Sequence, residues 1–210
     1  LVDGPMLVVA DRIDTIYNFL KEHGLHDQFH PSYTRMAPAH YVTELSLVGC
    51  PDPNPIYHRF FEPAMSHLEP DVAVIGRAYI EAAYREVEKW LKNTATEGPI
   101  GVCFSGGIDS GAIFMLTYHA LLKLGESPSR LKAFTLSVDG GGEDLKQARK
   151  FLEANKLKLF LEPIEVNRED IDWKETIRIT EDYKALDIEA ASMGLALCRG
   201  IRERYPDWRL

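Results

Sequence analysis

The sequence predicts an α/β fold over residues 98–210, with an open parallel sheet that has helices on both faces. A mainly helical, proline-rich region over residues 1–97 precedes it. Two observations predict the sheet. Residues 99–104, PIGVCF, form a short uninterrupted apolar run, which is typical of a strand buried on both faces. Strand-like and helix-like patterns then alternate along the chain, and this alternation is typical of parallel strands joined by right-handed crossovers.

The first 97 residues predict two helices and one strand. Apolar residues recur at helical spacing over 11–24, where Gly24 is a natural end. Prolines interrupt residues 26–70, and only residues 40–48 alternate with the period of a strand. Residues 71–94 predict a long helix, because Asp71 can cap its start. An apolar stripe runs along this helix and comprises Val72, Ile75, Tyr79, Ala83, Val87 and Trp90.

The change of pattern near residues 94–99 predicts a boundary between a region 1–97 and a domain 98–210. In that domain the strands are expected over 99–104, 131–138 and 157–164. The helices are expected over 110–125, 143–156, 170–184 and 187–205. Residues 207–210, DWRL, look like the start of a further strand.

Composition excludes several classes of protein. The net charge is −8 over 210 residues and no basic cluster occurs, so no nucleic-acid partner is expected. Cys50, Cys103 and Cys198 are far apart in the sequence, which is typical of a reducing compartment, and Cys103 is expected in the core. Because no segment reads as a signal peptide or a membrane span, we expect a cytoplasmic protein without membrane association.

The stretch GVCFSGGIDSGAIF, residues 101–114, predicts a site for a phosphate group. Its two glycines lie between a strand and a helix, at the carboxyl end of a parallel strand, where open α/β sheets bind ligands. The amides at a helix N-terminus favour an anion, and Ser105 and Ser110 add hydroxyl donors. No lysine follows the glycines, so the stretch is not a Walker A loop. The alternative is a tight turn without a ligand.

Asp109 stands beside the expected phosphates, where its negative charge would be repelled. A hard cation between the two resolves the repulsion, so the residues themselves favour a site for pyrophosphate or triphosphate with Mg²⁺, in which Asp109 binds the metal.

The string SGGIDS, residues 105–110, resembles the S-G-G-x-D-S loop of the N-type ATP pyrophosphatases, the PP-loop superfamily. The resemblance implies an adenine-nucleotide alpha-hydrolase-like fold and cleavage of ATP between its α and β phosphates. It also implies that the β and γ phosphates are held by Ser105, Gly106, Gly107, Asp109 and Ser110, with Asp109 on Mg²⁺. Phe104 and Leu136, at the ends of two strands, would flank the adenine.

The sequence that follows residues 105–110 resembles the synthetase domain of asparagine synthetase and β-lactam synthetase. The similarity rests on LKAFTLSV, on the EDLKQARKFLEANKLKLFLEPIEV segment with Asp144 at its helix start, and on residues 185–210. It implies an AMP-forming ligase that adenylates a small carboxylate and passes it to ammonia or an amine. The resemblance implies that Asp144 lies near the phosphates. The alternative is that its carboxylate only stabilises the helix dipole.

The resemblance also has departures. The family's second acidic glycine-rich motif and a later lysine are expected beyond residue 210, so the catalytic residues are unknown here. The chain is a fragment, a reduced homologue or one part of a longer product. Residues 1–97 do not resemble a glutaminase domain, so a separate amidotransferase or carrier-protein partner is a candidate, as is a homo-oligomer.

Three alternatives remain: an NAD-synthetase-like enzyme, an RNA-modifying or sulfur-transferring PP-loop enzyme, and a nucleotide-binding homologue without catalysis.

Acidic residues also gather near the end of a predicted helix. This cluster is either a solvated face or an amine-binding pocket, and it comprises Glu181, Asp182, Asp187 and Glu189.

Overall fold

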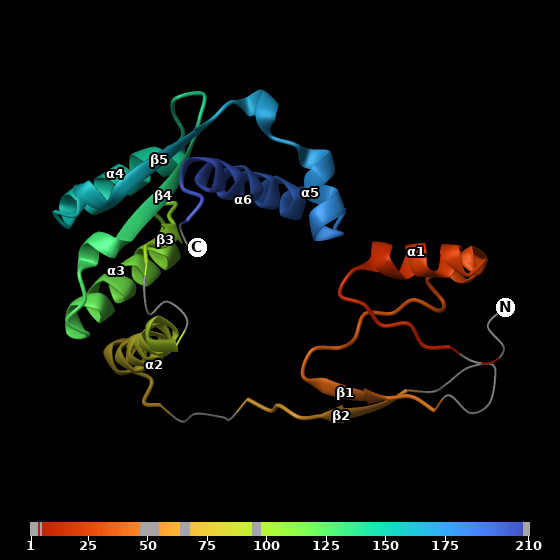
Figure 1. The fold of residues 1–210 in the computed structure, drawn as a ribbon. Helices are drawn as coiled ribbons and strands as arrows, with labels where there is room; N and C mark the ends of the chain where they lie inside the picture. Colours follow the sequence, from red (N-terminus) through yellow and green to blue (C-terminus); the bar gives the residue numbers. More distant parts are fainter. Residues whose placement is uncertain (1–3, 5, 47–54, 64–67, 94–97, 208–210) are drawn as a thin grey trace. The chain divides into compact units, whose positions relative to one another are not determined.

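The computed structural model describes residue 4 and residues 6–46, 55–63, 68–93 and 98–207. The chain divides into two compact units, Leu1–His67 and Leu68–Leu210, and each is described by itself (Figure 1). Among the described residues, no helix combines the length and the apolar character needed to cross a bilayer.

The first unit combines a short helix with a two-stranded ribbon. Helix α1 (Ile13–Glu22) confirms the helix predicted over 11–24, and a 3₁₀ turn, η1 (His26–Gln28), follows it. Strand β1 (Tyr41–Glu44) lies within the predicted strand 40–48. It pairs antiparallel with β2 (Ile56–Arg59), which the sequence did not predict. Strand β2 follows three closely spaced prolines, and its partner, rather than its own pattern, defines it.

The second unit contains the predicted parallel sheet, in the order β3-β4-β5. The strands are β3 (Ile100–Cys103), β4 (Leu131–Val138) and β5 (Leu161–Val166). Helix α2 (Val72–Asn93) comes before the sheet, and α3 (Ile108–Lys123) and α4 (Glu143–Ala154) connect its strands. Helices α5 (Trp173–Thr180) and α6 (Ala185–Arg204) follow it. Short 3₁₀ turns are η2 (Pro128–Arg130), η3 (Lys158–Phe160) and η4 (Arg168–Asp170).

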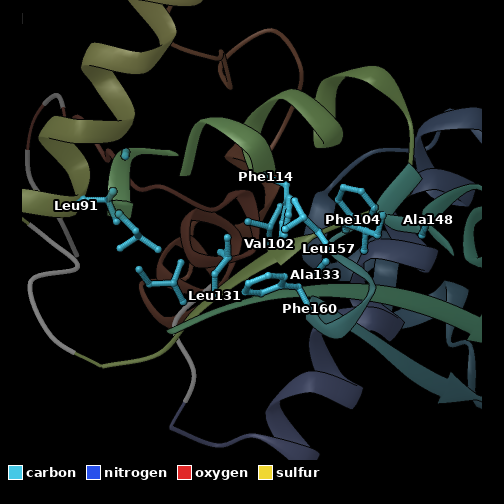
Figure 2. Close-up of a cluster of buried hydrophobic side chains, with 13 residues drawn as sticks. Leu91, Val102, Phe104, Phe114, Leu131, Ala133, Ala148, Leu157 and Phe160 are labelled. Atoms are coloured by element: carbon cyan, nitrogen blue, oxygen red, sulfur yellow. The ribbon is translucent and has the colours of Figure 1, made fainter. Parts of the chain in front are cut away.

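Helices cover both faces of this sheet, which confirms the predicted fold class. Alternate residues of a strand point to opposite faces, and Ala133 and Phe134 accordingly belong to two different cores. Figure 2 shows the larger core, where β3 and β4 pack against α2, α3 and α4. The smaller core joins Phe134 and Ile164 to Leu197 and Ile201 of α6.

Two expectations about burial need correction. The apolar stripe of α2 is buried only in its second half, where Val87, Trp90 and Leu91 pack on the larger core, while Val72 and Tyr79 are exposed. The compact unit Leu68–Leu210 includes this helix.

Cys103 was expected in the core but is exposed. It is the last residue of β3, whose only partner among the described strands is β4, and its thiol adjoins that of Cys198 on α6. Partial burial, reinforced by Cys198, raises the pKa of the Cys103 thiol to about 11.

Candidate functional site

Residues 104–110 form the loop and first helical turn that follow β3, and we call this segment the 104–110 loop. Its first residue is tied to the neighbouring strand. The Phe104 amide donates to the Phe134 carbonyl over 2.7 Å, and the Thr135 hydroxyl donates to the Phe104 carbonyl, also over 2.7 Å. Because Thr135 is fully buried, the second bond is shielded from water. The loop therefore begins from a fixed point at the carboxyl edge of the sheet.

Two serine hydroxyls face each other across this loop. The Ser105 and Ser110 Oγ atoms are 3.1 Å apart, and the Gly107 amide donates to Ser105 Oγ over 3.3 Å. Ser110 Oγ also donates to the Gly107 carbonyl over 3.2 Å. The segment thus gathers two hydroxyls and the amides of a helix N-terminus in one place, a donor set suited to an anion.

Gly106 brings the loop against helix α4. Its φ is +78°, and a Cβ built on it would lie 2.3 Å from the backbone nitrogen of Ala148. A side chain is therefore excluded both by the backbone conformation and by the neighbouring helix. This close approach accounts for the first of the two glycines and connects the loop to α4.

Helix α3 begins at Ile108 and not at residue 110 as expected, so Asp109 and Ser110 lie in its first turn. Asp109 is exposed and makes no hydrogen bond or ion pair with another residue of the described ranges. A carboxylate in the first turn of a helix is stabilised by the helix dipole. Its oxygens remain accessible to an approaching cation.

The predicted adenine-flanking residues do not come together. Phe104 is only 1% exposed and packs edge-to-face on Phe114 and Phe151 in the larger core. Leu136 packs against the smaller core on the opposite face of the sheet. The two side chains therefore lie on opposite faces of the sheet. Leu136 lies on the face of the sheet that α6 covers, and the Phe104 ring lies in the larger core on the other face.

Ser137 is a polar residue that sequence reasoning missed. It is 0% exposed, and its hydroxyl has no hydrogen-bond partner among the described residues. It lies on the same face of β4 as Thr135, one pleat nearer the carboxyl edge. A serine on the buried face of a strand near that edge was the signal that could have found it.

The carboxyl edge of β4 continues into a glycine turn. Asp139 has a φ of +52°, and its carboxylate accepts a hydrogen bond from the Arg168 amide over 3.0 Å and pairs with that residue's guanidinium. Asp144 lies exposed in the first turn of α4, where it is favourably placed for the helix dipole.

The acidic residues 181–189 divide between two roles. The Asp182 carboxylate accepts hydrogen bonds from the amides of Lys184 and Tyr183, which lower its pKa. Lys184 pairs with both Asp182 and Asp187. Glu189 instead lines a groove between α5 and α6. In the described part of the chain, no three His, Cys, Asp or Glu residues gather as a metal site.

The fold and the loop can now be compared with known protein families. The fold is an open parallel α/β sheet with a loop of hydroxyls and amides at the carboxyl edge of its first strand. Residues 87–205 match the asparagine synthase family, so the chain belongs to that family, which carries the synthetase domain of the PP-loop superfamily. The members of this family are generally ATP-dependent ligases that form amide bonds. A comparison with curated proteins finds no match.

Proposed function

We propose that the protein is an AMP-forming ligase that adenylates a small carboxylate and transfers the acyl group to ammonia or an amine. The observation that carries the proposal is the SGGIDS string, which follows the first parallel strand inside the family match. Because the family generally uses ATP, the anion that this donor set favours is the triphosphate of ATP.

The 104–110 loop holds the β and γ phosphates in this proposal. Ser105 and Ser110 donate from their hydroxyls, and the amides of Gly106 and Gly107, at the start of helix α3, donate beside them. Ser137, whose buried hydroxyl lacks a partner in the described structure, lies toward the same edge of the sheet.

The residues present fit a magnesium ion. Mg²⁺ in nucleotide sites is bound by one or two carboxylates together with substrate phosphates, and it does not need a cage of protein ligands. Asp109, exposed beside the loop, supplies such a carboxylate. When bound, the ion would neutralise charge that develops on the leaving pyrophosphate.

The chemistry divides into two displacements. In the first, a carboxylate oxygen of the substrate forms a bond to the α-phosphorus of ATP, the bond from that phosphorus to the bridging oxygen breaks, and pyrophosphate leaves. In the second, an amine nitrogen attacks the activated acyl carbon, AMP leaves, and the nitrogen loses a proton. The protein contributes mainly position and electrostatic stabilisation of the departing phosphates.

The test is ATP–pyrophosphate exchange by the full-length protein with Mg²⁺ and a panel of carboxylic acids that includes aspartate. Exchange that depends on one acid supports the proposal and identifies the acid. Asp109→Ala should abolish this exchange without loss of fold, whereas Asp14→Ala, at the same place in helix α1, should leave it unchanged. Exchange that persists in Asp109→Ala contradicts the site.

Binding of ATP without exchange for any acid would favour a different class, a nucleotide-binding homologue. The hydroxyls and amides of the 104–110 loop would then bind the nucleotide without catalysing a reaction. Tight binding of tRNA at physiological salt would favour the RNA-modifying alternative, against which the net charge of −8 argues.

A further inference from the structure

An open groove of about 470 Å³ lies between helices α5 and α6, and we call it the α5–α6 groove. Its walls are apolar and aromatic, with Trp173 56% exposed and Tyr183 82% exposed. Several apolar side chains lie together here, and a contiguous exposed apolar patch marks a site of interaction, whereas single exposed apolar residues do not. The groove is lined by Trp173, Ile177, Tyr183, Ala185, Ile188, Glu189, Ser192 and Met193.

The polar groups at the base of the groove are already satisfied by the protein. Ser192 Oγ donates to the Ile188 carbonyl over 2.7 Å and lies 3.1 Å from Thr176 Oγ1. Thr176 Oγ1 donates to the Asp172 carbonyl over 2.8 Å. The base therefore does not require a hydrogen bond from a ligand, and recognition falls to the apolar walls and to the one carboxylate among the lining residues.

That carboxylate belongs to Glu189. No Lys or Arg is among the lining residues. Lys184 pairs with Asp182 and Asp187, and Lys174, which does not line the groove itself, lies over the ring of the lining residue Trp173. Arg178 and Arg199 both pair with Glu175, on the same two helices. Glu189 forms no ion pair or hydrogen bond with a residue of the described ranges. The groove thus presents a negative charge beside apolar walls.

The groove lies on the side of the sheet edge where the 104–110 loop begins. Cys198 of α6 adjoins Cys103, the last residue before that loop. Arg204, at the other end of α6, donates to the Pro163 carbonyl near the start of β5, so α6 runs antiparallel to the strands. Glu189 precedes Cys198 by nine residues, which places it about 14 Å farther along the helix, beyond the carboxyl ends of the strands.

We propose that the α5–α6 groove binds a small organic cation, one with a hydrocarbon or aromatic body and a single ammonium group. Apolar walls take the body, and Glu189 is the counter-ion of the ammonium. A carboxylate ligand of the same shape is disfavoured by the same charge. That this cation is a substrate of the ligase, with the ammonium as its recognition group, rests on the proposed function.

The test is a titration of the full-length protein with 2-phenylethylammonium, followed by ligand-observed NMR. We expect saturable binding, with 3-phenylpropionate binding far more weakly. Glu189→Gln should weaken the binding about threefold to tenfold, because the carboxylate is exposed to solvent. Glu203→Gln, at an exposed position on the same helix, should leave it unchanged. Trp173→Ala should weaken binding of the ammonium and of neutral 2-phenylethanol alike.

Absence of saturable binding overturns the proposal, as does equal binding of the cation and the anion or no effect of Glu189→Gln. A parallel titration with Mg-ATP separates this proposal from the proposed function. ATP binding without amine binding contradicts the groove assignment alone. Amine binding without ATP binding contradicts the ligase and leaves the groove as a cation site.

Discussion

Gly106 lies so close to the backbone of Ala148 that a Cβ at residue 106 would stand 2.3 Å from the Ala148 nitrogen. The neighbour is backbone in the second turn of α4, so it cannot rotate away as a flexible side chain can. The loop that follows the first parallel strand and the helix that follows the second are therefore packed without a gap.

The first prediction concerns this contact. Gly106→Ala should lower the free energy of unfolding by about 2–4 kcal/mol, from the strain of a positive φ and from overpacking. Gly140→Ala is the matched control, because its φ is +77° and nothing lies within 4 Å of its Cβ, so it should cost only about 1–2 kcal/mol. Urea unfolding measures both, and equal losses would contradict the contact.

A second glycine fixes helix α6 on the sheet. A Cβ at Gly200 would meet the Cγ2 of Ile164 at 2.4 Å, whereas a Cβ at Gly194 would meet nothing within 4 Å. Gly200→Ala should therefore destabilise the protein by about 1–2 kcal/mol, because the cost of overpacking exceeds the gain in helix propensity. Gly194→Ala in the same helix should stabilise it by about 0.5–1 kcal/mol. Thermal unfolding of both variants checks the opposite signs, and a stabilised Gly200→Ala would contradict the packing.

Glu162 predicts a pH dependence. Burial raises the pKa of this carboxyl, but hydrogen bonds from Lys132 and Tyr205 and the charges of Lys132 and Arg204 outweigh it and hold the pKa below 4.5. A lowered pKa means that the folded state favours the ionised form, so the stabilisation is present above 4.5 and is lost as the pH falls below that value.

Glu162→Gln should accordingly lower the free energy of unfolding by about 1–3 kcal/mol at pH 7. The difference from the wild-type protein should close on acidification. The control is Glu165→Gln, an exposed position on the same strand with no ion pair to a described residue. A difference that stays constant between pH 7 and pH 3 would argue against the ion pair.

The Cys103 thiol predicts slow alkylation. Its pKa is raised from 9.0 to about 11 by partial burial and by Cys198, and only the thiolate reacts, so iodoacetamide should modify it about 100-fold more slowly at neutral pH than a cysteine with the ordinary value. Cys198→Ala should speed the reaction, because Cys198 raises this pKa. Peptide mass spectrometry follows the residue separately, and fast labelling in the unaltered protein would contradict the assignment.

Much of the fold could be predicted because the local patterns agree with the packing. Strand β4 occupies the predicted residues 131–138, and the uninterrupted apolar run at 99–104 contains β3, as expected for a strand buried in a parallel sheet. Strand β2 could not be predicted, because a partner strand and not an apolar pattern defines it. The exposure of Cys103 and of the first half of α2 depends on which elements lie beside them, and periodicity does not reveal that.

The position of the 104–110 loop could be predicted from its glycines and hydroxyls, because these residue types favour a turn between a strand and a helix. That the loop binds phosphate stays a prediction. Sequence could not show that Phe104 and Leu136 lie on opposite sides of the sheet, because the face that a residue occupies depends on strand register. Their place beside an adenine stays a prediction. The groove at Glu189 arises from the packing of α5 on α6. Sequence showed only a run of acidic residues there, and the structure separates the paired members from Glu189. The predicted strand start at 207–210 lies mostly outside the described residues, and Asp207 is not in a strand.

The most direct test of the central claim is calorimetric titration of the full-length protein with ATP, with Mg²⁺ and with EDTA. The account predicts saturable binding that strengthens with Mg²⁺. Asp109→Asn should remove most of the Mg²⁺-dependent gain and leave the metal-free affinity nearly unchanged, because the carboxylate acts through the ion. No saturable ATP binding, or the same Mg²⁺-dependent gain in Asp109→Asn, would contradict the assignment of the loop.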